Sequence, residues 1–193
     1  TDDGSKYEAD MIIVAVGVRP NTKLAKDIGI ELGKNKAIRV DKKMRTSVED
    51  IYAVGDCAQT FSKITDEEVY IPLGSTANKM GRIAGDVITG GDLEFRGILG
   101  TGIFKSFEMG VGCTGLTEKE AIKKGYNIEV IHNIKNNQTK YFKNSSLMVI
   151  KAIADRDTQK ILGVQIIGKK GIDKRLDVFI SVITLGGKIS DLF

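Results

Sequence analysis

The hydrophobic and polar positions in the first half of the chain form two short apolar runs and one segment of helical periodicity. The runs at 9–16 and 51–54 are rich in β-branched residues, end at glycines and are typical of buried strands. From residue 72 the apolar positions lie three or four residues apart, which predicts a helix that Ser75 or Thr76 caps and Gly90 ends. Its apolar face would comprise Met80, Ile83, Ala84, Val87 and Ile88. Strands followed by a helix indicate an α/β arrangement for this half.

The pattern changes after a glycine-rich seam at 97–102, beyond which short strands predominate. Thr117 and Glu120 have the spacing of a capping box at the start of a helix. The polar segment 155–160 predicts a hairpin turn. We expect an α+β unit, an antiparallel sheet with helices on one face. Its strands would be 103–107, 109–114, 128–134, 147–154 and 161–167, and its helices 117–124 and 172–185.

Composition narrows the class of protein. The chain has 193 residues, 41% hydrophobic and 28% charged, which suits a globular protein of one or two domains. The net charge is only +4 and the lysines are scattered without an aromatic ladder, so we expect no nucleic-acid partner. No apolar stretch of 18 residues and no signal peptide occur, so we expect no membrane segment and a cytoplasmic location.

The sequence contains few residues suited to metal or cysteine chemistry. Cys57 and Cys113 are far apart and form no C-x-x-C, and the single histidine, His132, alternates with apolar positions as a solvent-facing strand residue does. We therefore expect no structural disulfide and no metal site.

The pair Gly55-Asp56, where the second apolar run ends, is the strongest candidate for a ligand site. Ligands of open α/β sheets bind at the carboxyl ends of strands. Glycine lets a ligand approach the backbone, and an aspartate accepts hydrogen bonds from hydroxyl groups. The alternative is that Asp56 is an ordinary turn or helix cap.

Three segments in order resemble the flavin-dependent pyridine nucleotide–disulfide oxidoreductases. Residues 9–21, ending in Gly-Val-Arg-Pro-Asn, resemble the strand and turn that close their NAD(P)H domain. Residues 51–58 resemble their second flavin motif, whose aspartate holds the ribityl chain of FAD, and residues 72–88 resemble the helix whose N-terminus faces the flavin ring. The resemblance implies FAD and NAD(P)H as cofactors. It also implies a cofactor-binding set of Gly55, Asp56, Thr76, Ala77 and Asn137.

A finer resemblance lies in the second half. Residues 168–177, Gly-Lys-Lys-Gly-Ile-Asp-Lys-Arg-Leu-Asp, are similar to a motif of the branch containing coenzyme A-disulfide reductases, NADH oxidases and NADH peroxidases. The segment from Asn137 to Phe142 resembles their Asn-x-x-x-Tyr-Tyr, which implies that Asn137 approaches the flavin and Tyr141 faces the substrate across a dimer. Asn78 stands where the coenzyme A-disulfide reductases have a histidine near the substrate.

Two alternatives remain open in this half. Tyr141 could instead be a cross-strand packing residue. Lys174 and Arg175 could form a solvated helix face rather than bind an anion.

A G-x-G-x-x-G occurs at Gly110–Gly115, where it could signal a dinucleotide site. The predicted cap at Thr117 comes two residues too late, and no acidic residue follows at 131–137. A glycine-rich hairpin is the better interpretation.

These features predict a fragment of a larger enzyme. We expect the end of an NAD(P)H-binding domain at 1–20, the C-terminal part of a Rossmann-like FAD domain at 21–96, and an α+β dimerisation domain at 97–193, truncated at its C-terminus because Ser190 would cap a further helix.

The parent would be a homodimeric FAD-dependent NAD(P)H oxidoreductase that serves cell redox homeostasis. It would pass electrons through flavin and a cysteine redox centre outside this chain to a disulfide, persulfide, peroxide or oxygen. The isolated fragment is expected to be inactive. The alternative is a non-catalytic association domain without cofactor.

Overall fold

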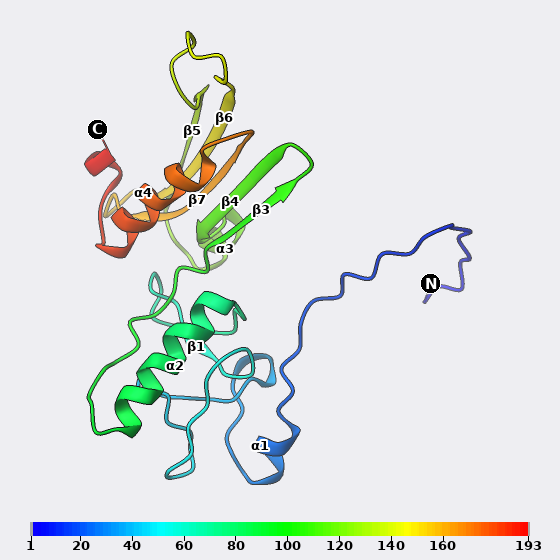
Figure 1. Ribbon diagram of the computed structural model, residues 1–193, viewed down its shortest axis with the longest axis vertical. Coiled ribbons are helices and arrows are strands. Elements are labelled where there is room, and N and C mark those ends of the chain that lie inside the picture. The colour runs from blue at the N-terminus through cyan, green and yellow to red at the C-terminus, as the bar shows by residue number, and fades with distance from the viewer. Residues whose placement is uncertain (1, 193) are drawn as a thin grey trace.

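The computed structural model describes residues 2–192, which form two stacked units and an extended N-terminal arm (Figure 1). The first unit has few regular elements. These are α1 (Lys23–Asp27), the 3-10 turn η1 (Lys34–Lys36), the short strands β1 (Thr60–Phe61) and β2 (Glu68–Val69), and α2 (Gly74–Ile88). Met44 and Met80, 0% and 1% exposed, lie at the centre of its core.

The prediction of two strands in the first half of the chain is wrong. Residues 9–16 are extended but lie in the arm, and Ile13 there is 85% exposed. In the second run, Tyr52 forms only an isolated bridge with Arg45, although Ala53 is buried. A strand requires a neighbouring strand for its backbone N–H and C=O groups. No such neighbour lies beside either run within residues 2–192.

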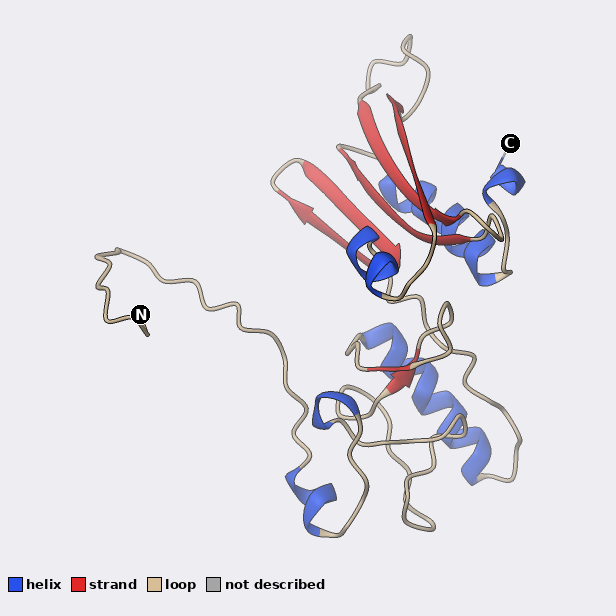
Figure 2. Cartoon of the chain, turned by 180° about the vertical axis from the view of Figure 1, so that it is seen from behind, coloured by secondary structure: helices blue, strands red, loops and turns tan. Residues whose placement is uncertain are grey.

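The second unit confirms the expected antiparallel sheet. The strand order is β3-β4-β7-β6-β5, and every neighbouring pair is antiparallel. The helices are α3 (Glu118–Lys123), α4 (Ile172–Thr184) and the final turn η2 (Ile189–Leu192). Figure 2 shows α4 against one face of the sheet. Ala121 of α3 packs instead with Ile153 and Leu162 on the opposite face, so the expectation that the helices share one face is wrong. The strands are β3 (Gly102–Ser106), β4 (Met109–Gly115), β5 (Ile128–Asn136), β6 (Leu147–Asp155) and β7 (Ile161–Gly168).

Of the two helix caps predicted in this unit, one is confirmed and one is wrong. Thr117 and Glu120 form both hydrogen bonds of the capping box, as expected. The cap expected at Ser190 is wrong, because Ser190 lies inside η2 and the side chain of Asp191 accepts from the Lys188 N–H instead.

The glycines of the G-x-G-x-x-G run are packing residues of β4. A Cβ on Gly110 would lie 2.7 Å from Cδ1 of Ile172, and one on Gly112 would lie 3.0 Å from Cδ2 of Leu176. The missing side chains let α4 approach the sheet closely. Since the run forms part of a strand paired on both sides, it provides no loop for a dinucleotide.

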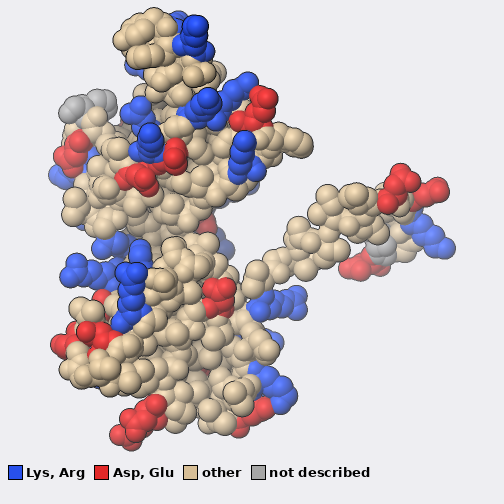
Figure 3. Space-filling model, in the orientation of Figure 1, with Lys and Arg blue, Asp and Glu red and all other residues tan. Residues whose placement is uncertain are grey.

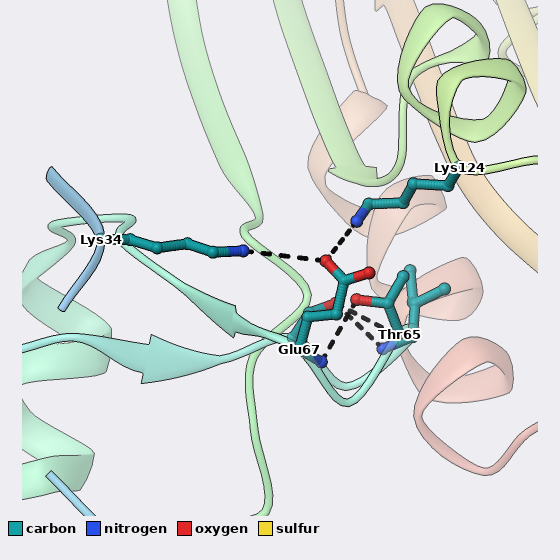
Figure 4. Close-up of polar contacts among 6 residues, drawn as sticks. Lys34, Thr65, Glu67 and Lys124 are labelled. Carbon is teal, nitrogen blue, oxygen red and sulfur yellow. Dashed lines mark hydrogen bonds and ion pairs between the residues drawn. The ribbon is translucent and has the colours of Figure 1, made fainter. Parts of the chain in front are cut away.

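The loop 62–67 joins the two units. The Lys63 N–H donates to the Ile98 carbonyl at 2.9 Å, which ties this loop to the connector between the units. Ile64 packs against the buried residues of the second unit. Figure 4 shows Glu67 between two lysines, with its Oε2 2.5 Å from Lys124 Nζ at the end of α3 and 3.9 Å from Lys34 Nζ.

We expect Glu67→Gln to remove a small, pH-dependent part of the stability. The hydrogen bond from Lys124 lowers the pKa of Glu67 below its usual 4.5. The stabilisation is therefore complete above about pH 4.5 and is lost as the pH falls through the folded-state value. Urea unfolding between pH 3 and 7 should show a difference from the parent protein at neutral pH that shrinks in acid. Glu49→Gln, an exposed control, should show none, and a difference that does not change with pH would contradict the ion pair.

Candidate functional site

The turn that contains Gly55 lies against the start of α2. Gly55 has φ +85°, and a Cβ built on it would lie 3.9 Å from Cβ of Ala77. The turn closes through a hydrogen bond from the Ala58 N–H to the Gly55 carbonyl, 3.1 Å long. A positive φ suits glycine, and the missing side chain leaves the backbone open to a neighbouring group. The structure thus brings together two segments, 51–58 and 72–88, that the sequence singled out separately.

The start of α2 differs from the expectation. The helix begins at Gly74 with Leu73 as its N-cap, so neither Ser75 nor Thr76 is the cap. Leu73 has extended dihedrals and no side-chain acceptor, and Thr76 is buried at 5% exposure. The first helical hydrogen bond runs from the Ala77 N–H to the Leu73 carbonyl at 2.9 Å. The N–H groups of residues 74–76 therefore have no acceptor within the helix and remain available to a ligand.

The carboxylate of Asp56 is free. Its side chain is exposed, and within residues 2–192 it accepts no hydrogen bond and caps no helix. Asp56 therefore lies in a turn, as the alternative allowed, but its side chain caps neither that turn nor a helix within residues 2–192. An exposed, unpaired carboxylate beside a helix N-terminus is suited to accept hydrogen bonds from ligand hydroxyl groups.

Tyr70 holds this turn and was missed by the sequence analysis. Its hydroxyl donates to the Asp56 carbonyl at 2.9 Å. Burial, together with the nearby Asp56 and Cys57, raises the pKa of Tyr70, so the phenol stays protonated and continues to donate. The only signal in the sequence was its place in the Val-Tyr-Ile-Pro segment before the helix.

The remaining expected site residues are Asn78, Asn137 and Tyr141. Asn78 is exposed in the first turns of α2, near the Gly55 turn, whereas the other two lie apart from that turn. Asn137 and Tyr141 belong to the β5–β6 loop, at the end of the second unit far from the first (Figure 1). The Asn137 side chain accepts from the Ser146 N–H at 2.9 Å and donates to the Lys170 carbonyl at 3.2 Å. It therefore fastens the base of the loop.

Tyr141 is presented to solvent. It is 81% exposed, and its ring centroid lies 4.7 Å from that of Phe142. It is in a loop, so the interpretation as a cross-strand packing residue is wrong. Within one chain, this tyrosine and the Gly55 turn do not meet (Figure 1).

Residues suited to metals do not gather. Within residues 2–192 no three His, Cys, Asp or Glu side chains are placed to hold an ion. His132 is exposed on β5, in register with Lys151. The helices of residues 2–192 include none with the length and apolar character that crossing a bilayer requires.

The chain thus combines a glycine turn beside a helix N-terminus with an antiparallel α+β unit. The family description "Pyridine nucleotide-disulphide oxidoreductase" matches residues 1–81, and its dimerisation domain matches residues 101–193. The chain belongs to the pyridine nucleotide-disulphide oxidoreductase family.

Individual relatives agree with this family. The chain is 42% identical to an NAD(P)H sulfur oxidoreductase (CoA-dependent) of Pyrococcus furiosus, over 99% of the chain and 43% of that protein. It is 38% identical to an NADH oxidase of Methanocaldococcus jannaschii, over 91% of the chain and 39% of that protein. The solved NAD-dependent persulfide reductase from A. fulgidus superposes with a TM-score of 0.93 at 35% identity, over 98% of this chain and 35% of that one. The chain thus spans less than half the length of the relatives it matches.

Proposed function

We propose that this chain is the flavin-contacting and dimer-forming part of an FAD-dependent NAD(P)H oxidoreductase. The observation that carries the proposal is the Gly55–Asp56 turn, which lies against the first turn of α2 with its carboxylate and the helix N–H groups free. Membership of the family implies FAD and NAD(P)H in the parent enzymes. We divide the chain at 1–20, 21–96 and 97–193, as expected from sequence. Two separate buried clusters support the boundary near 97.

The residues present fit FAD. Asp56 would accept hydrogen bonds from ribityl hydroxyls, and Gly55 would allow the close approach that these bonds need. The backbone around Thr76 and Ala77 would face the ring, where the free N–H groups and positive end of α2 favour negative charge. When bound, FAD supplies the capacity to take a hydride equivalent from NAD(P)H and pass on two electrons. Tyr70 keeps the turn in place by holding the Asp56 carbonyl.

We infer that the acceptor is a sulfur–sulfur bond, a disulfide or persulfide, with electrons passing through a cysteine redox centre outside residues 1–193. The names of two relatives, a sulfur oxidoreductase and a persulfide reductase, support a sulfur compound as the electron acceptor. Another relative is an NADH oxidase, so oxygen is the second candidate for the acceptor. The exposed Asn78 beside the flavin site would contact the substrate.

The dimerisation domain at 101–193 suggests a homodimer. In a homodimer, Asn137 and Tyr141 of one copy would reach the site of the other, which would explain why they lie far from Gly55 within one chain (Figure 1). A reducing cytoplasm fits the free thiols of Cys57 and Cys113.

We expect Asp56→Ala to lower flavin retention by roughly tenfold or more, because the site loses a charged acceptor for hydroxyl groups. The flavin-to-protein ratio after purification and dialysis measures this effect. Asp177→Ala, an exposed carboxylate on α4 in the second unit, is the matched control and should keep its flavin.

Unchanged flavin occupancy in Asp56→Ala would remove Asp56 from the site. If the chain of residues 1–193 without substitutions purifies as a colourless dimer that does not take up FAD, a non-catalytic role in association becomes the better proposal.

A further inference from the structure

The β5–β6 loop, residues 137–146, projects from the second unit without apolar support. It extends beyond the ends of β5 and β6 (Figure 1), and Figure 3 shows it as a separate projection with Lys or Arg side chains on its flank. Its aromatic side chains, Tyr141 and Phe142, are 81% and 51% exposed. A cavity of about 650 Å³ separates its base from the start of α4. Loops with few buried contacts open easily, so this one needs another source of order.

Side-chain hydrogen bonds close the base of the loop. Nδ2 of Asn136 donates to Oγ of Ser145 at 2.6 Å, and that hydroxyl donates to the Gln138 carbonyl at 3.1 Å. Oδ1 of Asn137 accepts from the Ser146 N–H at 2.9 Å. We refer to the side chains of Asn136, Asn137 and Ser145 as the polar clamp. It holds the two ends of the loop side by side.

The polar clamp also fixes the loop to the rest of the unit. Nδ2 of Asn137 donates at 3.2 Å to the carbonyl of Lys170, which directly precedes Gly171, the N-cap of α4. Nζ of the neighbouring Lys169 lies 3.1 Å from Oε2 of Glu108 in the β3–β4 turn. Three connections at this end of the sheet are therefore joined. Both ends of the Asn137 amide are used within the chain, which suits a residue that orients the loop.

The clamp is connected to the aromatic pair through two turns inside the loop. The Phe142 N–H donates to the Thr139 carbonyl at 3.1 Å, and the Ser145 N–H donates to the Phe142 carbonyl at 3.0 Å. Ser145 thus belongs both to the clamp and to the turn that carries Phe142. The Phe142 ring in turn contacts Tyr141, with 4.7 Å between the ring centroids.

We propose that Asn136, Asn137 and Ser145 are positioning residues, which hold Tyr141 in one orientation for the active site of the second copy. The inference rests on the proposed function, in which Tyr141 of one copy reaches the site of the other. A tyrosine that is already oriented avoids the entropy cost of ordering the loop when the substrate binds.

Hydrogen exchange of the full-length holoenzyme tests the clamp itself. We expect Asn137→Ala and Ser145→Ala to speed the exchange of the Phe142 and Ser146 amides by roughly tenfold, since each variant loses a hydrogen bond that closes the loop. Ser145→Thr keeps the hydroxyl and should restore the protection. The matched control is Asn144→Ala, an exposed amide of the same loop that forms no side-chain hydrogen bond within residues 2–192, and it should leave both amides unchanged.

Steady-state kinetics test whether the clamp acts through Tyr141. With cystamine as a simple disulfide, we expect Asn137→Ala to raise KM by roughly tenfold and to change kcat by less than about threefold, because only copies with an ordered loop bind the substrate productively. The same substitution should add little to Tyr141→Ala, since both changes remove one contact. Flavin reduction by NADH without the disulfide should be unchanged.

Unchanged exchange in both clamp variants, or equal acceleration in Asn144→Ala, would overturn the clamp. Additive losses for Asn137→Ala and Tyr141→Ala, or an altered flavin spectrum in Asn137→Ala, would overturn its action through Tyr141. No reduction of cystamine by the unsubstituted enzyme, or an unchanged KM in Tyr141→Ala, would contradict the proposed function on which the inference rests. Hydrogen exchange would still decide whether the clamp holds the loop, so the two failures are distinguishable.

Discussion

Gly163→Ala should destabilise the protein by about 3 kcal/mol or more, the largest effect we expect from any single methyl group. A Cβ at this position would lie 2.0 Å from the carbonyl oxygen of Leu116 and 2.8 Å from its nitrogen. Both atoms are backbone, and the Leu116 N–H donates to the Leu162 carbonyl at 2.8 Å. The chain cannot move a flexible side chain aside, so β7 would have to separate from the segment that follows β4.

Urea unfolding of the purified protein measures this effect. The matched control is Gly85→Ala, at an exposed position of α2 where a Cβ would meet nothing within 4 Å. There alanine should stabilise the protein by about 0.5–1 kcal/mol, because it reduces the freedom of the unfolded chain and favours the helix. Equal midpoints for Gly163→Ala and the parent protein would show that β7 and the residues after β4 are not in close contact.

Leu176→Ala should cost about 2–5 kcal/mol, because it opens a cavity between α4 and the sheet. Leu176 is 0% exposed, and its Cδ2 lies where a side chain on Gly112 would otherwise be. The neighbouring glycine has no side chain with which to fill the space, so the cavity collapses poorly. The loss should place this variant near the upper part of the range.

Leu185→Ala makes the same chemical change one residue beyond α4, where the side chain is 86% exposed. We expect that control to change the free energy of unfolding by less than about 0.5 kcal/mol. A similar loss in both variants would show that the cost at Leu176 does not come from its packing between α4 and the sheet. Denaturant unfolding followed by circular dichroism distinguishes the two outcomes.

The second unit was predictable because its signals are local. Its strands alternate, adjacent strands are joined by short turns, and Thr117 and Glu120 cap α3 from within four residues. The runs at 9–16 and 51–54 show the limit of such reasoning. Apolar composition indicated a tendency to be buried, but a strand also needs a neighbour to pair with, and that depends on other parts of the chain.

The features of the candidate site also divide into those that are local in sequence and those that depend on distant segments. The order of residues was enough to predict the family, the candidate ligand turn at Gly55 and Asp56, and the amphipathic helix beyond it, because each of these features lies within a short segment. Three features became apparent only in the folded chain: Leu73 rather than Ser75 precedes α2, Tyr70 holds the turn, and Glu67 pairs with Lys124 of the second unit. Those features depend on distances between segments far apart in the chain, and such distances exist only after the two units have folded and stacked.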